Sequence, residues 1–334
     1  MTDTSNAGGS KSASSSKPTI TPQPPRQPSA VISGVKPLVA PAPLTAVKEV
    51  PFAIDTSHER GKYLKLLAYA EYGVGKTFLM GTAADIPEMR DVIIVNCEAG
   101  DLTLHDPDHQ FHLIDSIRVR NYATLGRVQE YLKLHCRLRD AGDIDALKKT
   151  ESKLRNIPIE DIVEPRMYRT CILDSLSEAE AYCMYQLLGI TDTTKIDEES
   201  AAPEWAEYRR NHMMVQRLIR SFRDLNMHVL FTCGRAYVQD EAKRFLYSPA
   251  LTGKLSNQAQ GFVDMVGYMV SQPVSSTAEG EGASEKKIAR RMYVQPVGRF
   301  AAKCRFSSFK GTYFDNPDMK MIMKAIDLPT VTHV

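Results

Sequence analysis

Short apolar runs alternate with stretches of helical periodicity between about residue 62 and residue 235. A short apolar run bounded by polar residues is typical of a strand buried on both faces, whereas apolar positions three and four apart are typical of an amphipathic helix. The alternation of the two predicts a parallel α/β sheet. The predicted strands are 62–69, 91–96, 111–117, 168–173 and 228–233, and the predicted helices are 77–84, 122–139, 176–188 and 204–226; 141–156 is read as an exposed helix or a loop.

The pattern changes after residue 235, where the chain becomes loop-rich and mixed in charge up to residue 261. Closely spaced strands favour antiparallel pairing, because they leave no room for a crossover helix. The predicted fold class is therefore α/β, with a mostly parallel sheet, helices on both faces and an antiparallel C-terminal extension. The strands of this extension are predicted at 262–270, 291–296 and 300–306, with a polar insertion at 275–287.

Residues 1–50 form a different kind of segment. They are rich in Ser, hold 8 of the 19 prolines and contain no aromatic residue. Such a composition cannot bury enough apolar area to offset chain entropy, so we expect a disordered tail. Residues 51–334 are expected to form one domain.

Composition excludes several classes of protein. With 43% hydrophobic residues the chain can form a real core, and a net charge of +2 gives no general attraction to nucleic acid, so any such contact must be local. No stretch approaches the roughly 20 apolar residues of a membrane-spanning helix. The six cysteines lack disulfide-framework or zinc spacing, which indicates a reducing compartment, and we expect a cytoplasmic protein.

A Gly-rich turn between the first strand and the first helix reads Ala-Glu-Tyr-Gly-Val-Gly-Lys-Thr. Strand, loop and helix in this order are the context of a P-loop, in which backbone N–H groups surround phosphate oxygens. Lys76 would contact the phosphates and the Thr77 hydroxyl would ligate Mg²⁺. Ala70 stands where the usual motif has Gly, and Ala adopts positive φ less readily. The predicted nucleotide-binding residues are Ala70, Gly73, Val74, Gly75, Lys76, Thr77 and Phe78.

Three polar side chains lie at the ends of other predicted strands. Asp174 ends an apolar strand and is a candidate second contact for Mg²⁺, although Asp-Ser after a strand is also a common helix N-cap. Glu98 follows the strand at 91–96, the first after the P-loop, and could polarise the water that attacks a γ-phosphate; the alternative is a solvated loop carboxylate. Thr232, near Arg235, is a candidate γ-phosphate sensor or an ordinary strand-end residue. The ends of parallel strands meet at one edge of the sheet, so we expect these groups to lie together.

Lys303 and Arg305 lie two residues apart in the last predicted strand. With a period of two they point to the same side, where an anion is a natural partner. From spacing alone, a solvated charge pair on an exposed strand is the simpler explanation.

Taken together, these residues resemble the RecA superfamily core over about residues 62–306. The likeness is greatest to phage-encoded, RecA-like AAA ATPases that act in recombination and single-strand annealing. The segments that carry it are Asn-Cys-Glu-Ala-Gly at 96–100, Pro-Ala-Leu-Thr-Gly-Lys-Leu at 249–255 and Ala-Lys-Cys-Arg at 302–305.

The resemblance implies ATP and Mg²⁺ as ligands and Glu98 as the residue that activates water. It also implies that Lys303 and Arg305 reach the γ-phosphate of a neighbouring subunit, so that hydrolysis depends on self-assembly into a ring or filament.

In the RecA family, loops after the Walker B helix and after the sensor strand line the path of DNA. The second of these loops would be about residues 235–254, in which aromatic residues lie among the cations and could stack on bases. The first loop, 190–203, is acidic and a poor DNA ligand. A solvated charged face is the alternative for the cationic loop. The predicted DNA-binding residues are Arg235, Lys243, Arg244 and Lys254.

The function that follows is an ATP hydrolase that binds single-stranded DNA and acts in recombination or annealing, in the host cytoplasm if the chain is phage-encoded. A single-strand-binding protein is a further expected partner, and no membrane is involved. Three alternatives stay open: a replicative-helicase-like motor, an ATP-gated assembly protein without essential turnover, and a partner-driven ATPase without a DNA role.

Overall fold

The structure is a computed structural model that describes residues 62–98, 100–191, 193–199, 202–239, 243–275 and 286–328. The predicted tail, 1–50, and most of the predicted insertion at 275–287 lie outside the described residues. Among the described residues, no helix is long and apolar enough to cross a membrane.

The described strands form a mixed sheet in the order β10-β8-β7-β1-β5-β4-β2-β3. The pairs from β7 through β1, β5, β4 and β2 to β3 are parallel, whereas β8 and β10 extend the sheet in antiparallel fashion. Two further antiparallel pairs join β6 to β5 and β9 to β7. The strands are β1 (Lys65–Ala70), β2 (Val92–Asn96), β3 (Ile114–Arg118), β4 (Thr170–Asp174), β5 (His228–Gln239), β6 (Phe245–Pro249), β7 (Met265–Ser275), β8 (Lys286–Tyr293), β9 (Lys303–Cys304) and β10 (Tyr313–Asp315).

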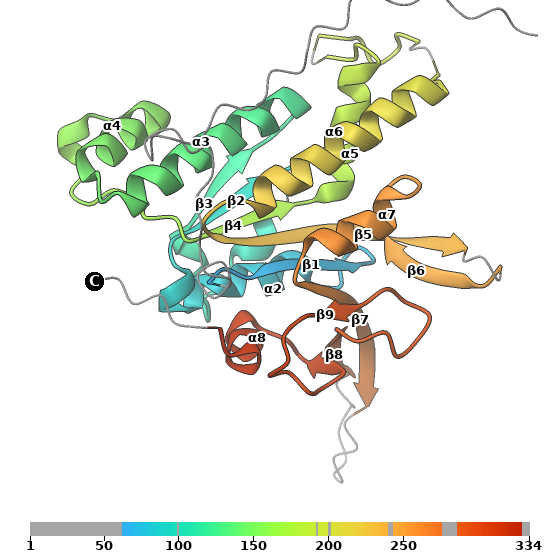
Figure 1. The fold of residues 1–334 in the computed structure, drawn as a ribbon. Coiled ribbons are helices and arrows are strands. Elements are labelled where there is room, and N and C mark those ends of the chain that lie inside the picture. The colour runs from blue at the N-terminus through green and yellow to red at the C-terminus, as the bar shows by residue number, and fades with distance from the viewer. Residues whose placement is uncertain are drawn as a thin grey trace, which may run out of the picture. The chain divides into compact units, whose positions relative to one another are not determined.

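Helices cover both faces of this sheet (Figure 1). One core packs Leu67 and Tyr69 of β1 against α3, α5, α6 and α7, and the other packs Leu66 and Ala68 against α2 and α8. This alternation follows from the two-residue period of a strand. The predicted fold class is confirmed. The helices are α2 (Lys76–Gly81), α3 (Tyr122–Asp140), α4 (Ile144–Arg155), α5 (Leu176–Leu187), α6 (Trp205–Arg223), α7 (Leu255–Phe262) and α8 (Met319–Ile326).

The region after the last parallel strand differs from the sequence prediction. The predicted loop at 236–261 was wrong, because β5 continues to Gln239, pairs with β6 and is followed by α7. The predicted strand at 300–306 is reduced to the two residues of β9, and β10 and α8 were not predicted. The β5–β6 hairpin extends past the parallel sheet, where Tyr237 and Phe245 are exposed, so it lacks the apolar alternation by which a strand is recognised.

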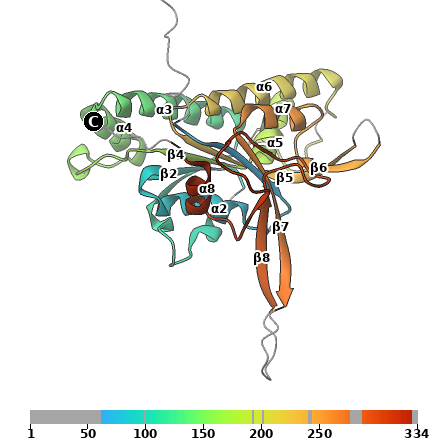
Figure 2. The ribbon, with the colours of Figure 1, turned by 60° about the horizontal axis from the view of Figure 1, so that its bottom comes forward.

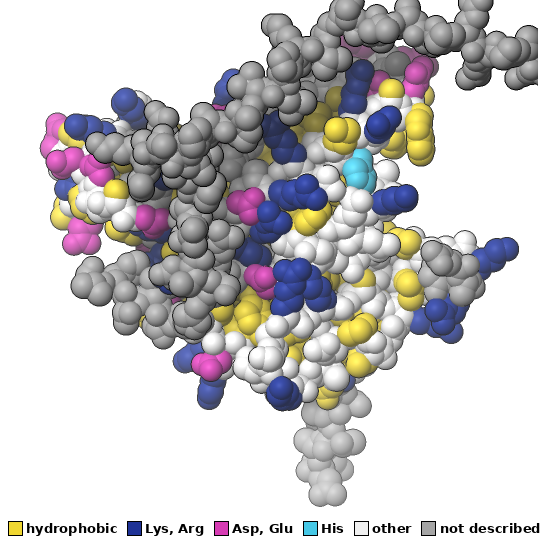
Figure 3. Space-filling view, viewed as in Figure 1, with side chains coloured by type: hydrophobic (Ala, Val, Ile, Leu, Met, Phe, Trp, Pro, Cys, Tyr) yellow, Lys and Arg dark blue, Asp and Glu magenta, His cyan; other side chains and the backbone are white. Residues whose placement is uncertain are grey.

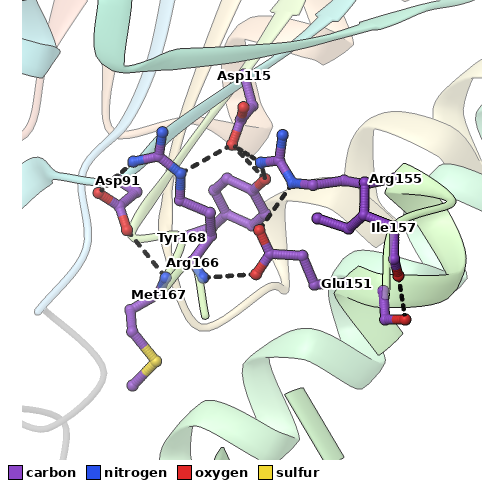
Figure 4. A network of polar contacts seen from close by, with 9 residues as sticks. Asp91, Asp115, Glu151, Arg155, Ile157, Arg166, Met167 and Tyr168 are labelled. Carbon is purple, nitrogen blue, oxygen red and sulfur yellow. Dashed lines mark hydrogen bonds and ion pairs between the residues drawn. The ribbon is translucent and has the colours of Figure 1, made fainter. Parts of the chain in front are cut away.

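A polar network joins α4 to Asp91 and Asp115, which lie at the amino ends of β2 and β3 (Figure 4). Arg155 donates to Asp115 of β3 at 2.6 Å and to Glu151 at 2.7 Å. Arg166 pairs with Asp115 at 3.3 Å and with Asp91 at 3.5 Å. The network explains why the end of the charged segment predicted as a helix or a loop is a helix: Glu151 and Arg155 have fixed partners.

A buried histidine makes the stability of this fold depend on pH. His228 accepts a hydrogen bond from the Leu64 backbone N–H through Nδ1 at 3.1 Å, and burial, reinforced by Lys65, lowers its pKa to about 3. The folded state therefore excludes a proton that the unfolded state binds below pH 6.5, and stability is lost as the pH falls from 6.5 toward 3. We expect the free energy of unfolding to be about 2 kcal/mol lower at pH 5 than at pH 7 from this residue.

Urea titrations at the two pH values test this, with His228→Asn as the comparison. Asn keeps an acceptor oxygen for Leu64 but does not titrate, so the variant should lose less stability between pH 7 and pH 5 than the wild type. His135, whose pKa burial lowers to about 4, leaves a residual dependence in both proteins. An identical loss in both proteins would contradict the assignment to His228.

Candidate functional site

Four of the sequence-predicted groups meet at the carboxyl edge of the parallel sheet. Ala70 ends β1 and pairs with Gly234 of β5, and Asp174 ends β4 and pairs with Asn96 of β2. The residue two positions after Asn96 is Glu98. The order of these strands, β1-β5-β4-β2, therefore places the predicted P-loop, sensor, carboxylate and Glu98 side by side along one edge.

The P-loop has the backbone that its glycines permit. Gly73 and Gly75 have φ of 74° and 103°, in the left-handed region that favours glycine. Ala70, in contrast, lies within β1 and is fully buried, so its position requires no positive φ. The departure from the usual motif therefore leaves the loop backbone intact.

Lys76 opens α2 and is buried, with 7% of its surface exposed. Its ammonium donates to the carbonyl oxygens of Glu71 at 3.1 Å and Ala70 at 3.5 Å. These acceptors belong to the same loop, so the ammonium is held over the space that the loop encloses. An anion there would offer it a stronger partner than either carbonyl.

Thr77, Asp174 and Thr232 form one hydrogen-bonded chain. The Thr77 hydroxyl donates to Asp174 Oδ2 at 2.7 Å, and the Thr232 hydroxyl donates to Asp174 Oδ1. Asp174 is 1% exposed and Thr232 is fully buried. A hydroxyl and a carboxylate are the hard oxygen ligands that Mg²⁺ prefers, so Thr77 and Asp174 fit the predicted metal contacts.

Glu98 lies next along the edge and is held by a partner that the sequence did not identify. Its Oε1 accepts a hydrogen bond from the hydroxyl of Ser175, the residue after Asp174 that caps α5. Burial and then the negative charge of Glu98 raise the pKa of Glu178. The sequence held a signal for the Ser175–Glu98 contact: Ser175 directly follows Asp174, so it lies at the same sheet edge as Glu98.

Arg235 is tied to the P-loop. Its guanidinium forms an ion pair with Glu71, which follows Ala70, and donates to the Tyr268 hydroxyl at 3.2 Å. It also lies over the rings of Tyr247, 4.4 Å from the ring centre, and Tyr237 at 5.1 Å. The predicted DNA-binding residue thus connects the P-loop to the base of the β5–β6 hairpin.

The other predicted DNA-binding residues lie beyond this point. Lys243 and Arg244 lie at the described end of the β5–β6 hairpin, with exposed side chains, and Phe245 beside them is 62% exposed. Lys254 is exposed at the start of α7.

Lys303 and Arg305 lie at the opposite end of the sheet. Lys303 pairs with Val266, which pairs with Leu67 near the amino end of β1. The Lys303 ammonium donates to the carbonyl oxygens of Gln260 and Val263, both at 2.7 Å, and Arg305 donates to that of Gly261 at 3.0 Å. Both cations thus bind carbonyls at the C-terminal end of α7, where the helix dipole favours positive charge. They do not approach the P-loop of their own chain.

Comparison with known protein families matches residues 62–306 to the AAA domain family. The chain belongs to this family. The matched range contains the whole carboxyl edge described above and ends one residue after Arg305. This AAA-domain chain therefore carries the nucleotide-binding core of a P-loop NTPase.

Two solved structures are similar to this AAA-domain chain over most of its length. The RadB recombinase is 14% identical, with 69% of this chain and 79% of that chain covered and a TM-score of 0.33. The flagellar accessory protein FlaH from Methanocaldococcus jannaschii is 9% identical, with 75% and 84% covered and a TM-score of 0.37. No curated protein matches the chain. The phage origin and the recombination role therefore stay predictions.

Proposed function

We propose that this AAA-domain protein hydrolyses ATP with Mg²⁺ and couples turnover to single-stranded DNA in recombination or annealing. The observation that carries the proposal is the chain of Thr77, Asp174 and Thr232, with Glu98 beside it on the same sheet edge. A phosphate loop, a metal-ligand pair and a separate carboxylate are the parts that phosphoryl transfer to water requires.

Each residue has a role that follows from its contacts. Lys76 leaves the carbonyls of its own loop for the β- and γ-phosphates of ATP. Thr77 and Asp174 would hold Mg²⁺, which would supply positive charge to those phosphates. Glu98 accepts a proton from the attacking water, and Ser175 fixes the direction of its carboxylate. Thr232 connects Asp174 to β5, so a change at the phosphates reaches the strand that leads to the β5–β6 hairpin.

The positions of Lys303 and Arg305 support a site completed by a second copy. They lie at the sheet end opposite the P-loop, so only the P-loop edge of another subunit is open to them. Arg305 is the stronger candidate, because its side chain is 53% exposed and pairs with Asp264 at 3.5 Å, whereas the Lys303 ammonium donates to two carbonyl oxygens at 2.7 Å each. Lys and Arg side chains also gather over α6 on the face that Figure 3 shows. Arg220 of this helix lies 4.5 Å from the ring centre of Phe262 in α7.

The β5–β6 hairpin supports the DNA contact. Exposed Tyr237 and Phe245 offer ring faces for base stacking, and Lys243 and Arg244 lie close to them with charges that can neutralise phosphates. Because Arg235 joins the same hairpin to Glu71 of the P-loop, DNA bound there would act on the nucleotide site directly.

ATP hydrolysis by the purified protein, measured with and without single-stranded DNA, tests the proposal, and Lys76→Ala gives the blank. We expect severalfold stimulation by DNA. The double variant Lys243→Ala/Arg244→Ala should lose the stimulation but keep basal turnover. Lys149→Ala/Lys153→Ala, which removes two exposed cations from α4, is the matched control and should behave as wild type.

Hydrolysis that is indifferent to DNA would contradict the DNA-gated mechanism and favour a partner-driven ATPase. Binding of ATP without hydrolysis would favour the assembly protein that uses ATP only as a switch.

A further inference from the structure

The β7–β8 hairpin forms a wall beside the P-loop. Tyr69 of β1 pairs with Tyr268 of β7, which pairs with Tyr293 of β8. Beyond the Tyr69–Tyr268 pair, β1 ends at the next residue, Ala70, whereas β7 continues to Ser275. The hairpin thus extends past the carboxyl edge of the parallel sheet, as Figure 2 shows, and stands on the side of β1 away from Asp174.

Two consecutive arginines of β8 point to opposite faces of this wall. Arg290 shares a face with Met292, which is fully buried in the core that contains α2. Arg291 turns the other way, pairs with Asp315 at 2.7 Å and lies 4.0 Å from the ring centre of Tyr313. Only Arg290 therefore faces the side on which the P-loop helix lies.

Arg290 reaches the P-loop itself. Its Nε donates to the Val74 carbonyl oxygen at 3.0 Å, and a Cβ on Gly75 would stand 2.9 Å from that Nε. The guanidinium carbon lies 5.9 Å from the ring centre of Phe78. The Arg290 backbone is fixed by two hydrogen bonds with Asn316, of 2.8 Å and 2.6 Å, so the side chain starts from a rigid position.

Within the described part of the chain, the charge of Arg290 has no carboxylate partner, and the side-chain hydrogen bond described for it uses Nε. The terminal guanidinium nitrogens therefore lie beside a phosphate-binding loop, and their N–H groups can donate to a ligand there. A structural arginine on this face would be expected to pair as Arg291 does with Asp315.

The direction of a bound nucleotide follows from the rest of the site. The γ-phosphate must lie toward Thr232 and Glu98, on the β5–β4–β2 side of the P-loop. The nucleoside end must then leave on the opposite side, where β8 stands. We propose that Arg290 binds the α-phosphate and ribose end of the nucleotide through its terminal nitrogens, while Lys76 binds the terminal phosphates. This inference rests on the proposed nucleotide binding at the P-loop.

Calorimetric titration with ADP and with pyrophosphate, both with Mg²⁺, tests the assignment. We expect Arg290→Ala to weaken ADP binding by about ten- to hundredfold, the range for a lost hydrogen bond to a charged group. Pyrophosphate fills the terminal phosphate positions that Lys76 binds and supplies neither the α-phosphate nor the ribose, so its affinity should be nearly unchanged. Arg291→Ala removes the adjacent charge from the opposite face and should bind both ligands as the wild type does.

A merely structural role, in which Arg290 only shapes the loop through Val74, would weaken ADP and pyrophosphate equally, and that result would overturn the inference. Equal ADP affinity in wild type and variant would overturn it as well. Arg290→Lys, which keeps the charge but loses the planar fork, serves the same test should the Ala variant fail to fold, with ADP again selectively weakened. Failure of the wild type to bind ADP or ATP would instead overturn the proposed function itself.

Discussion

We expect Glu98→Gln to lower ATP turnover by about a hundred- to ten-thousandfold, the range for loss of a positioned general base, while ATP binding stays close to wild type. The Gln side chain has the same shape, and its amide oxygen can still accept the hydrogen bond from Ser175. It cannot take a proton from water. The loss should therefore fall on the chemical step and leave the P-loop contacts in place.

Single-turnover hydrolysis at saturating ATP measures that step directly. Glu178→Gln is the control. It removes a second carboxylate near Glu98: burial and then the charge of Glu98 raise the pKa of Glu178, but Glu178 lies one helical turn after Ser175 in α5. This variant should keep normal turnover. A Glu98→Gln protein that hydrolyses ATP at the wild-type rate would contradict the catalytic role of Glu98. A variant that assembles, binds DNA and functions without turnover would instead favour the ATP-gated assembly protein.

Arg305→Ala is expected to lower turnover by about a thousandfold or more, as for the loss of an arginine finger supplied by another subunit. Arg305 is half-exposed, donates to the Gly261 carbonyl at 3.0 Å and pairs with Asp264 at 3.5 Å. Its loss should therefore leave the fold and the nucleotide affinity of the single subunit nearly unchanged. Arg223→Ala removes a cation that pairs with Asp224 at the end of α6 and should have little effect.

A mixture of two inactive variants decides whether the arginine acts between subunits. The Glu98→Gln protein has an intact Arg305, and the Arg305→Ala protein has an intact Glu98. In a random equal mixture about a quarter of the head-to-tail contacts join one intact group to the other, so activity should reappear on mixing. A mixture as inactive as its components would show that Arg305 does not complete a neighbouring site.

The parallel core could be predicted from sequence because its strands are buried on both faces and therefore read as uninterrupted apolar runs. The runs at 91–96 and 168–173 became β2 and β4 with shifts of one or two residues. The eight-residue α8 was missed although Met319, Ile322 and Ile326 follow helical spacing, because so short an amphipathic pattern also fits a loop.

The candidate site, too, could be predicted only in part from the sequence. The expectation that Thr77, Asp174 and Thr232 lie together rested on the carboxyl ends of parallel strands meeting at one edge, and the three side chains are hydrogen-bonded there. The contacts of Glu71 with Arg235 and of Val74 with Arg290 could not be predicted. They span long stretches of sequence and depend on the order of strands in the sheet, which no local pattern of residues records.

The opposite placement of the P-loop and Arg305 on the sheet has a consequence for stoichiometry. A contact that joins one end of a subunit to the other end of the next is directional, so an open filament always has one terminal P-loop without an arginine and one terminal arginine without a P-loop. An open chain of n copies then holds n − 1 complete sites, whereas a closed ring of n copies holds n. Short filaments would be poor catalysts per subunit. Growth would raise the share of complete sites, and only closure into a ring would complete the last one.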